Sequence, residues 1–379
     1  MLDISLVILS AGESSRFKIK TKKQWLRIGD TPLWLNVTNS IASSYAFKEI
    51  IVTGSADDLP YMYKFCDFKI VKGGTTRQNS LINALQYINS EYVLVSDAAR
   101  CFVPKTLTQR LLDEAGSADI IVPYLPVTDT VIYEENAINR DKVKLIQTPQ
   151  LSKTKILKEA LLNGGDFTDE SSAIVSCGGS VKYILGDIRA EKITLTNAKN
   201  SPLSLLSPPL QEIFTGFGFD AHAYEKGKIM YLGGVKIEDS YGFAAHSDGD
   251  VVIHALIDAL LGAAGAGDIG EWFPDSNIAY KNINSTKLLE KVVLFLMRVG
   301  FEIVHCDITI IAQKPKVSPF KQAISKRLSS ILNISPVHVN IKATTTENMG
   351  FIGREEGIAV QAVANIKYYD WTTDENLNC

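Results

Sequence analysis

The stretch "ISLVILSAGESSRFKIKTKKQ", residues 4–24, decides the fold class of the first half of the chain. Residues 4–9 form a short, mostly apolar run, which is typical of a buried β-strand. The run enters a glycine-containing loop, and a loop after the first strand of an open α/β sheet lies where ligands bind. Backbone N–H groups there can bind phosphate, and Arg16 and Lys23 add positive charge. The stretch fits neither GxGxxG nor GxxxxGK[ST], and a solvated basic loop would look the same.

Outward from this loop, short apolar runs alternate with helical patterns up to about residue 195. Further strands are expected at 49–54, 92–97, 119–124 and 192–196, with helices at 76–89 and 104–116. Such alternation predicts a mainly parallel sheet with helices on both faces. Residues 197–212 contain three prolines and little charge, which is typical of a linker. We therefore predict an α/β domain over residues 1–196.

A second pattern begins after the linker and predicts an α+β domain over residues 213–369. Strands are expected at 214–222, 302–313, 337–345 and 357–369, and helices at 247–267, 285–300 and 318–333. The polar tail at 370–379 is expected to fray. We find no internal repeat in the sequence.

The overall composition restricts the class of protein. The 379 residues are 46% hydrophobic and carry a formal net charge of −3, which is typical of a globular protein and argues against a nucleic-acid partner. We expect no membrane partner and no signal peptide, because no apolar run reaches ~18 residues and the N-terminus lacks a basic region. The five cysteines are scattered and form no CxxC, which indicates free thiols and a cytoplasmic location.

Two segments of the first domain strengthen the interpretation of the loop as a phosphate site. "GGTTRQNSL" (73–81) is a glycine pair that opens a helix, and "VSDAAR" (95–100) places Asp97 at the end of a strand. Carboxylate oxygen at that position is a natural ligand for Mg²⁺. Three segments that converge on one sheet edge favour phosphate chemistry.

With these motifs, residues 1–196 resemble the 2-C-methyl-D-erythritol 4-phosphate cytidylyltransferase family. Further matching segments are "PVTDT" (126–130), "QTPQ" (147–150), "FTDESSA" (167–173) and "ILGDIRAEKIT" (184–194). The resemblance implies a Rossmann-like nucleotidyltransferase sheet, CTP as a substrate and Mg²⁺ or another divalent ion at Asp97. It implies that Arg16 and Lys23 neutralise the triphosphate in the transition state.

The same resemblance implies where the substrates bind. Arg140 and Lys192 would hold methylerythritol phosphate, with Arg140 reaching in from a dimer partner. The implied substrate-binding residues are Ser10, Gly12, Gly73, Gly74, Ser80, Asp97, Arg100, Thr130 and Thr148, of which Gly73, Gly74 and Ser80 would hold the cytosine. Three positions depart from the family pattern, which usually has glycine at Ser14 and proline at Lys22 and Cys101. We assign the catalytic role to Lys23 rather than Lys22 because Lys23 directly precedes Gln24.

The segment "GFGFDAH" (216–222) raises a second candidate site. In a strand, residues i and i+2 point to the same face, so Asp220 and His222 share one. Alone, the pair is compatible with a local hydrogen bond. Asp250, His254 and Asp258 in "HSDGDVVIHALID" (246–258) are spaced to share a helical face.

Two interpretations of His254 remain open at this point. Two histidines and one aspartate (Asp220, His222 and His254) with an open fourth position match the construction of catalytic zinc sites, and Asp258 would then orient His254. The alternative is a core histidine that is hydrogen-bonded to Asp258. The segment "KATTTENMGFIGREEG" (342–357) has the pattern of a capping box, Thr344-x-x-Glu347. A helix start there could also bind phosphate, and Glu347 could hold a second divalent ion.

Residues 213–369 resemble the 2-C-methyl-D-erythritol 2,4-cyclodiphosphate synthase family. The matching segments are "GFDAH" (218–222), "LGGV" (232–235), "AHSDGDVVIHALIDALLGAAGAGDIGEWFPDS" (245–276), "DITIIAQKPK" (307–316) and "KATTTENMGFIGREEGIAVQAVA" (342–364). The resemblance implies a ferredoxin-like domain that forms trimers. It implies Zn²⁺ at Asp220, His222 and His254, and Mg²⁺ or a similar ion at Glu347.

The resemblance also implies the remaining roles in this domain. His246 and Thr345 would stabilise the transition state, and 267–270 with 273–276 would bind the erythritol end. The implied substrate-binding residues are Ser247, Asp248, Asp268, Ile269, Gly270, Phe273, Asp275, Ala312, Lys316, Thr344, Thr346, Phe351 and Arg354. Of these, Ala312, Lys316 and Thr344 would bind the cytidine nucleotide.

Together the two resemblances predict a bifunctional enzyme of the non-mevalonate isoprenoid route. It would transfer CMP from CTP to 2-C-methyl-D-erythritol 4-phosphate, and later cyclise 4-diphosphocytidyl-2-C-methyl-D-erythritol 2-phosphate with release of CMP. The intervening kinase is a separate protein, with which the chain could associate. One alternative is an active cyclase whose first domain is a nucleotide-binding scaffold, and another is a nucleotide sensor or scaffold for the kinase. Dimeric first domains and trimeric second domains together predict a hexamer.

Overall fold

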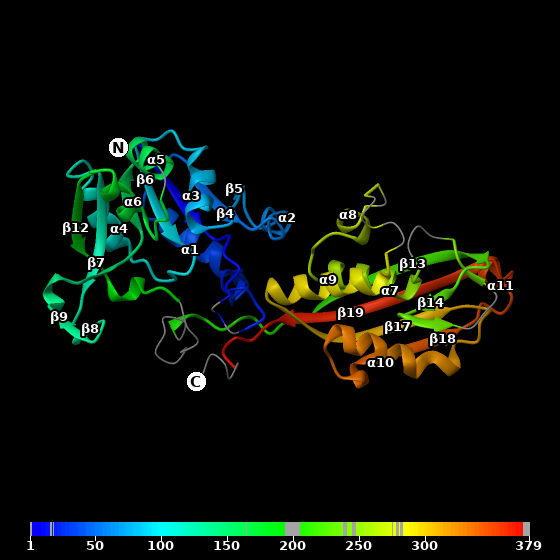
Figure 1. The fold of residues 1–379 in the computed structure, drawn as a ribbon. Helices are drawn as coiled ribbons and strands as arrows, with labels where there is room; N and C mark the ends of the chain where they lie inside the picture. Colours follow the sequence, from blue (N-terminus) through cyan, green and yellow to red (C-terminus); the bar gives the residue numbers. More distant parts are fainter. Residues whose placement is uncertain are drawn as a thin grey trace. The chain divides into compact units, whose positions relative to one another are not determined.

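The structure of the protein is a computed structural model that describes residues 2–15, 17, 19–163, 165–193, 205–237, 241–244, 248–274, 276–277, 280 and 283–373. The chain divides into two compact units (Figure 1). Unit 1 comprises Met1–Pro209 together with the C-terminal residues from Asp370, and unit 2 comprises Leu210–Tyr369.

The sheet of unit 1 is built around β1 (Ile4–Leu9), whose six residues are all buried. It pairs in parallel with β4 (Ile50–Gly54) and β6 (Tyr92–Asp97), and β4 pairs in parallel with β5 (Lys69–Lys72). Because every residue of β1 is buried, both faces of this strand are covered, as its apolar sequence predicted. The helices of this unit are α1 (Leu33–Ala42), α2 (Leu59–Met62), α3 (Arg77–Leu85), α4 (Lys105–Asp113), α5 (Thr154–Leu162) and α6 (Glu170–Ser176).

The other half of this sheet is mixed. β11 (Gln150–Lys153) runs antiparallel to both β6 and β7 (Ile120–Pro126), β10 (Lys144–Ile146) is antiparallel to β7, and β12 (Val181–Leu185) is parallel to it. The predicted fold class is confirmed. The predicted strand at 192–196 is wrong for Lys192 and Ile193, which are irregular, and the rest of it lies outside the described residues.

Short hairpins and 3₁₀ turns complete unit 1. They are β2 (Arg27–Ile28), β3 (Thr31–Pro32), β8 (Val131–Tyr133), β9 (Asn136–Ile138), η1 (Lys23–Trp25), η2 (Arg140–Lys142) and η3 (Ile188–Ala190). Gly29 N–H donates to the Pro208 carbonyl at 3.1 Å, so the described end of the predicted linker is attached to the β2–β3 hairpin.

The C-terminal tail is also attached to this hairpin. Trp371 is only 3% exposed, and its indole N–H donates to the carbonyl of Arg27 at 2.7 Å. The expectation that the tail frays is therefore wrong for Trp371. Residues 374–379 lie outside the described residues.

Unit 2 contains a five-stranded sheet in the order β16-β13-β19-β17-β18. The strands are β13 (Phe214–Lys226), β16 (Tyr241–Phe243), β17 (Phe301–Ile311), β18 (Val339–Thr344) and β19 (Gly357–Tyr368), and only the β17–β18 pair is parallel. A separate hairpin joins β14 (Met230–Leu232) to β15 (Val235–Ile237). The mixture of antiparallel strands and helices is the predicted α+β class.

The helices of unit 2 form one layer on the sheet. α7 (Val251–Ala263) packs on β13 and β19, α9 (Ser285–Arg298) packs on α7 and β17, and α10 (Lys321–Leu332) packs on α9 and β18 (Figure 1). On the opposite face of β13, Phe217 and Phe219 are more than half exposed. Shorter elements are α8 (Ile269–Trp272), α11 (Gly350–Gly353), η7 (Ser318–Phe320) and η8 (Pro336–His338).

Two glycines of β13 let α7 approach the sheet closely. A Cβ at Gly216 would lie 2.0 Å from the carbonyl oxygen of Ala259, and one at Gly218 would lie 2.0 Å from that of Ala255. No side chain other than hydrogen fits at such distances. The alternation of "GFGFDAH" therefore places two glycines, and then Asp220 and His222, on the face that α7 covers.

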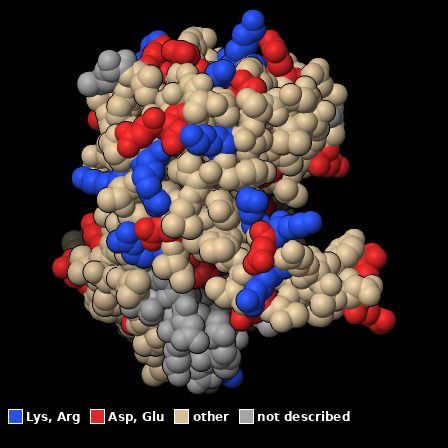
Figure 2. All heavy atoms as spheres, turned by 90° about the vertical axis from the view of Figure 1, so that its left-hand side faces the viewer, with Lys and Arg blue, Asp and Glu red and all other residues tan. Residues whose placement is uncertain are grey.

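Charge is mixed on the surface of the protein. Figure 2 shows lysine and arginine side chains interspersed with aspartate and glutamate on the face drawn. Among the described residues, no helix combines the length and the apolar character needed to cross a membrane.

Candidate functional sites

The first candidate site is a cavity of about 740 Å³ at the carboxyl edge of the unit 1 sheet. It is lined by the loop after β1, by the glycine pair after β5, and by the end of β6. These are the three segments that the sequence predicted to converge. The predicted residues in its wall are Ser10, Gly12, Lys23, Gly73, Gly74, Ser80, Asp97 and Lys192.

The glycine pair is required by close packing in the cavity wall. A Cβ at Gly73 would lie 2.2 Å from the Cβ of Ala11, and one at Gly74 would lie 2.3 Å from the Cβ of Asn79. Ser80 Oγ accepts from Gly74 N–H at 3.0 Å and donates to the Thr76 carbonyl at 2.9 Å. The loop is thereby held against the first turn of α3, whose N-cap is the side chain of Thr76.

The two neighbouring lysines of the first loop have different surroundings. Lys22 is buried and its ammonium group contacts Asp58 at 3.1 Å, as well as Glu13 and Ser55. Lys23 lines the cavity, and its ammonium group donates to the carbonyl of Ile193 at 2.7 Å. Lys22 is thus committed to a structural ion pair, whereas Lys23 faces the space where a ligand would bind.

Ser14, which stands where a glycine was expected, ties the loop to Lys23 and Gln24. Its φ of 54° lies in the left-handed region that glycine adopts most easily. Its hydroxyl oxygen accepts from Lys23 N–H at 3.0 Å and donates to Gln24 Oε1 at 3.1 Å. These two hydrogen bonds compensate for the strain and fix the loop beside Lys23.

A chain of alternating charges forms the floor of the cavity. Arg77 donates to Asp97 at 3.0 Å and to Glu170 at 2.8 Å, and Lys192 donates to Asp97 at 2.7 Å. Burial opposes ionisation of Asp97, but Arg77 and Lys192 outweigh it and hold the pKa of its carboxyl well below the usual range. Burial raises the pKa of the Glu170 carboxyl, although Arg77 opposes this.

A second cavity of about 470 Å³ shares Arg77, Asp97 and Lys192 with the first. Its wall contains two predicted residues, Arg100 and Thr148, which are joined by a hydrogen bond of 2.7 Å from Arg100 Nε to Thr148 Oγ1. Burial lowers the pKa of the Arg100 guanidinium. The two cavities therefore meet at a common wall of charged side chains.

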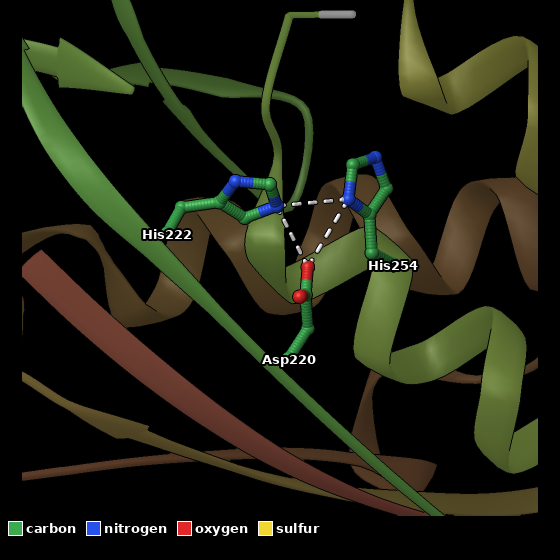
Figure 3. A group of neighbouring side chains, drawn as sticks. All are labelled: Asp220, His222 and His254. Atoms are coloured by element: carbon green, nitrogen blue, oxygen red, sulfur yellow. Dashed lines mark hydrogen bonds and ion pairs between the residues drawn. The ribbon is translucent and has the colours of Figure 1, made fainter. Parts of the chain in front are cut away.

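The third candidate site is a cluster of three side chains in unit 2. Figure 3 shows Asp220 and His222 of β13 and His254 of α7 pointing toward one another. Asp220 Oδ2 lies 2.9 Å from His222 Nε2 and 3.1 Å from His254 Nδ1, and the two nitrogens are 3.3 Å apart. The helix reaches this position because Gly216 and Gly218 permit close packing.

These distances are close to those around a tetrahedral metal ion. Zinc bonds of about 2.0–2.2 Å at tetrahedral angles would place neighbouring ligand atoms about 3.3–3.6 Å apart, so the two nitrogens have this spacing and the carboxylate oxygen would have to move a few tenths of an ångström away from them. Burial opposes the charge of Asp220, but His222 and His254 hold the pKa of its carboxyl well below the usual range. Burial likewise opposes the imidazolium of His222, but Asp220 raises the pKa of that ring. A carboxylate between two imidazoles is a suitable donor set for a divalent cation.

Comparison with known proteins gives a family for each unit. The family model for 2-C-methyl-D-erythritol 4-phosphate cytidylyltransferase matches residues 4–200, and the YgbB family model matches residues 213–367. The bifunctional enzyme IspD/IspF of Aliarcobacter butzleri is 55% identical over 98% of this chain and 99% of that protein, and that of Campylobacter fetus is 54% identical with the same coverage. The chain belongs to the bifunctional IspD/IspF family.

A solved structure gives the same assignment. The bifunctional IspDF from Campylobacter jejuni is 46% identical, has a TM-score of 0.88, and is covered over 98% of this chain and 100% of that one. The chain is therefore a two-activity enzyme of the methylerythritol phosphate route to isoprenoids, with a cytidylyltransferase in unit 1 and a cyclodiphosphate synthase in unit 2.

Two residues in the cytidylyltransferase site were missed by the sequence analysis. Arg77 and Glu170 lie within the segments "GGTTRQNSL" and "FTDESSA" that carried the resemblance, but nothing in either segment shows that they meet. Two predicted residues, Thr130 and Arg140, do not line either cavity of this chain, and Arg140 instead contacts the carbonyl of Thr128. Arg16 lies outside the described residues.

The partner of His254 in the cyclodiphosphate synthase site was predicted wrongly. Asp258 accepts from Ile269 N–H at 2.8 Å, whereas His254 Nε2 contacts Ser285 Oγ at 3.0 Å. Asp250 does not extend the helical face toward the cluster, because it is the N-cap of α7 and accepts from Ile253 N–H. Its oxygens also accept from the backbone of Gly233 and Gly234.

The predicted capping box is also wrong. Glu347 and Asn348 have positive φ, and the next helix, α11, begins only at Gly350. Thr345 Oγ1 instead donates to the Glu347 carboxylate at 2.7 Å. In the described residues, Glu347 is not a member of the Asp220 cluster.

The other predicted residues of this domain occupy three separate places. The first place is α8, which contains or adjoins Asp268 (its N-cap), Ile269, Gly270 and Phe273. The second is the start of α9, where Asp248 is hydrogen-bonded to Ser285. Ala312, Lys316, Thr344, Thr346, Phe351 and Arg354 lie at or beyond the ends of β17 and β18. His246, Ser247 and Asp275 lie outside the described residues.

Proposed function

We propose that the two adjoining cavities of unit 1 bind CTP and methylerythritol phosphate on either side of Asp97. The observation that supports this arrangement is the common wall, in which Arg77, Asp97 and Lys192 face both cavities. A phosphate nucleophile is already anionic, so the reaction needs positioning and charge neutralisation rather than a general base. Lys23 would neutralise the triphosphate, and Lys192 would orient the attacking phosphate.

We propose Mg²⁺ as the metal of this site, held by Asp97. The carboxylate is a hard oxygen donor at the sheet edge, which is the kind of ligand that Mg²⁺ prefers. When bound, the ion would supply charge neutralisation for the phosphates. Arg77 holds one oxygen of Asp97, while Lys192 would have to share the other with the ion.

In unit 2 we propose that Asp220, His222 and His254 hold Zn²⁺, with a fourth position open to a substrate phosphate. When bound, zinc would act as a Lewis acid and template for the β-phosphate. His246 and Thr345 would steady the transition state, and Glu347 would hold a second divalent ion. Folding of the substrate would bring its 2-phosphate to the β-phosphate, an effect that is worth up to roughly 7–11 kcal/mol.

A single copy of unit 2 does not bring Thr345 and Glu347 to the Asp220 cluster. Asp220 pairs with Val360, which pairs with Ile310, which pairs with Ala343. Three strand spacings of about 4.8 Å put the segment after Ala343 about 14 Å from Asp220. Adjacent phosphates of one substrate cannot bridge that gap, so we propose that Thr344–Glu347 of a second copy complete the site.

The open face of the sheet supports a trimer of this unit. Phe217 and Phe219 are exposed on the face opposite α7, where apolar side chains gain stability by contact with further copies. We also propose that Arg140 completes the cytidylyltransferase site of a dimer partner. Arg140 is an exposed residue of η2, just after the β8–β9 hairpin, and it lines neither cavity of its own chain.

We expect the intact chain to form a hexamer, because a closed particle that combines two-fold and three-fold axes needs at least six chains. Light scattering should give a mass near six times 41.6 kDa. A stable monomer or isolated dimer that retains cyclase activity would contradict the shared trimer site.

The function is tested by assaying the two reactions separately on the full chain. With CTP and methylerythritol phosphate, we expect release of pyrophosphate, and with the separate kinase and ATP added, release of CMP. Binding of CTP without pyrophosphate release would make unit 1 a scaffold or sensor.

We place the enzyme in the cytoplasm, since Cys66, Cys101, Cys177 and Cys306 are free thiols. Association with the kinase would be tested by co-sedimentation.

A further inference from the structure

We infer that Ser285, held by Asp248, is a positioning residue that fixes the tautomer of His254 for metal binding. This inference rests on the proposed zinc site. It concerns the second nitrogen of the His254 ring, which faces away from Asp220 and His222.

The direction of the hydrogen bonds follows from the donors available. Ser285 is fully buried, and its hydroxyl contacts two groups, Asp248 Oδ1 at 2.5 Å and His254 Nε2 at 3.0 Å. The hydroxyl has a single hydrogen, and an ionised carboxylate can only accept. The hydrogen therefore goes to Asp248, and the oxygen of Ser285 must accept from the ring.

In the neutral ring, only one tautomer can donate to Ser285. His254 then carries its hydrogen on Nε2, which leaves the lone pair of Nδ1 directed at the cluster, where it faces the Asp220 carboxylate unless a cation lies between them. A metal-bound histidine needs such a lone pair, and the hydrogen bond on its other nitrogen decides which nitrogen is free. The chain Asp248–Ser285–His254 thus prepares Nδ1 as a ligand.

Asp248 is itself held firmly. Its second carboxylate oxygen accepts from Ser285 N–H at 3.1 Å, and Oδ1 also accepts from Asp250 N–H at 3.3 Å. Ser285 is the first residue of α9. The start of α9 and the segment before α7 are therefore joined at the point where they orient His254.

The test measures zinc affinity of the full-length protein by competition with a chromogenic chelator. Removing a partner of a metal-bound histidine typically costs 10–100-fold in affinity, so we expect Ser285→Ala to weaken zinc binding by at least about 10-fold. Ser285→Thr retains the hydroxyl and should keep the affinity within a few-fold. Thr286→Ala is the matched control, because it removes a hydroxyl from the same helix start that bonds Asn284 instead.

A second variant distinguishes an effect on the tautomer of His254 from an effect on the packing around Ser285. Asp248→Asn is nearly isosteric, but its amide can donate to Ser285, whose hydrogen would then turn toward His254 Nε2. That arrangement favours a hydrogen on Nδ1, so we expect Asp248→Asn to lose zinc affinity although its thermal unfolding stays close to that of the parent protein. The same effect of a wrong histidine tautomer is known from the catalytic triad.

The outcomes are distinct. Unchanged zinc affinity in both Ser285→Ala and Asp248→Asn would overturn the inference, as would equal losses in Ser285→Ala and Thr286→Ala. Parent protein that binds zinc but does not cyclise would contradict the proposed function without affecting the inference. Parent protein that binds no zinc would overturn both.

Discussion

His254→Ala is expected to abolish zinc binding and cyclisation while cytidylyl transfer continues. His254 would supply one of the three proposed ligand atoms, and only an aspartate and one histidine would remain in the variant. The two units have separate cores, so loss of a ligand in unit 2 should leave the cavities of unit 1 intact. Metal analysis of the purified full-length variant, together with both assays, measures the effect.

A histidine elsewhere in unit 2 provides the control for His254→Ala. His338 is an exposed residue of η8 that lies outside the Asp220 cluster, so His338→Ala should keep its zinc and both activities. A full complement of zinc in the His254→Ala protein would show that the ligand set is wrong. Loss of both activities together would indicate unfolding of the whole chain instead.

The shared face of Asp220 and His222 was predictable from the sequence because it rests on local periodicity, whereas the approach of His254, 34 positions away on α7, was implied by the family resemblance. Alternation along β13 places Asp220 and His222 on one face, and the glycines before them allow a helix to pack there. The contact of Ser285 with His254 was not predictable, because it joins residues 31 positions apart through the packing of α9 on α7. Asp258 was the nearer candidate by spacing, but its carboxylate is used by the backbone of Ile269.

The same distinction applies to unit 1. The parallel strands around β1 were predicted from apolar runs, whereas β11 (Gln150–Lys153) was missed because only one of its four residues is apolar. The convergence of the loops on Asp97 was predicted, since carboxyl ends of parallel strands share an edge. The link from Asp97 through Arg77 to the buried Glu170 was not, because α6 reaches this edge only by tertiary packing.

The capping box failed for a local reason. Thr344 and Glu347 have the correct spacing, but Glu347 and Asn348 have positive φ, whereas the first turn of an α-helix has negative φ. The segment instead forms a turn closed by Thr345 and Glu347. A sequence pattern that specifies two residues out of four does not determine the backbone conformation that the neighbouring residues impose.

Lys23→Ala is expected to slow cytidylyl transfer by at least about 10²-fold, equivalent to about 2.7 kcal/mol of transition-state stabilisation, with little loss of stability. Lys23 lines the cavity beside the loop after β1, where we propose that the triphosphate binds and negative charge would develop. The ammonium group of Lys23 donates to the backbone carbonyl of Ile193, so this contact is not a buried ion pair like that of Lys22 with Asp58. Pyrophosphate release measured alongside thermal unfolding separates the two effects.

Two neighbouring lysines make the Lys23→Ala experiment specific. Lys20→Ala removes an exposed positive charge from the same loop and should leave the rate of cytidylyl transfer within a few-fold of the parental rate. This variant controls for the loss of any positive charge from the loop. Lys22→Ala would instead strand Asp58 in the interior, and breaking a buried pair in this way typically costs about 3–5 kcal/mol of stability. If Lys23→Ala released pyrophosphate at nearly the parental rate, the catalytic charge would have to come from another residue. If the Lys22→Ala protein were then stable but inactive, that residue would be Lys22.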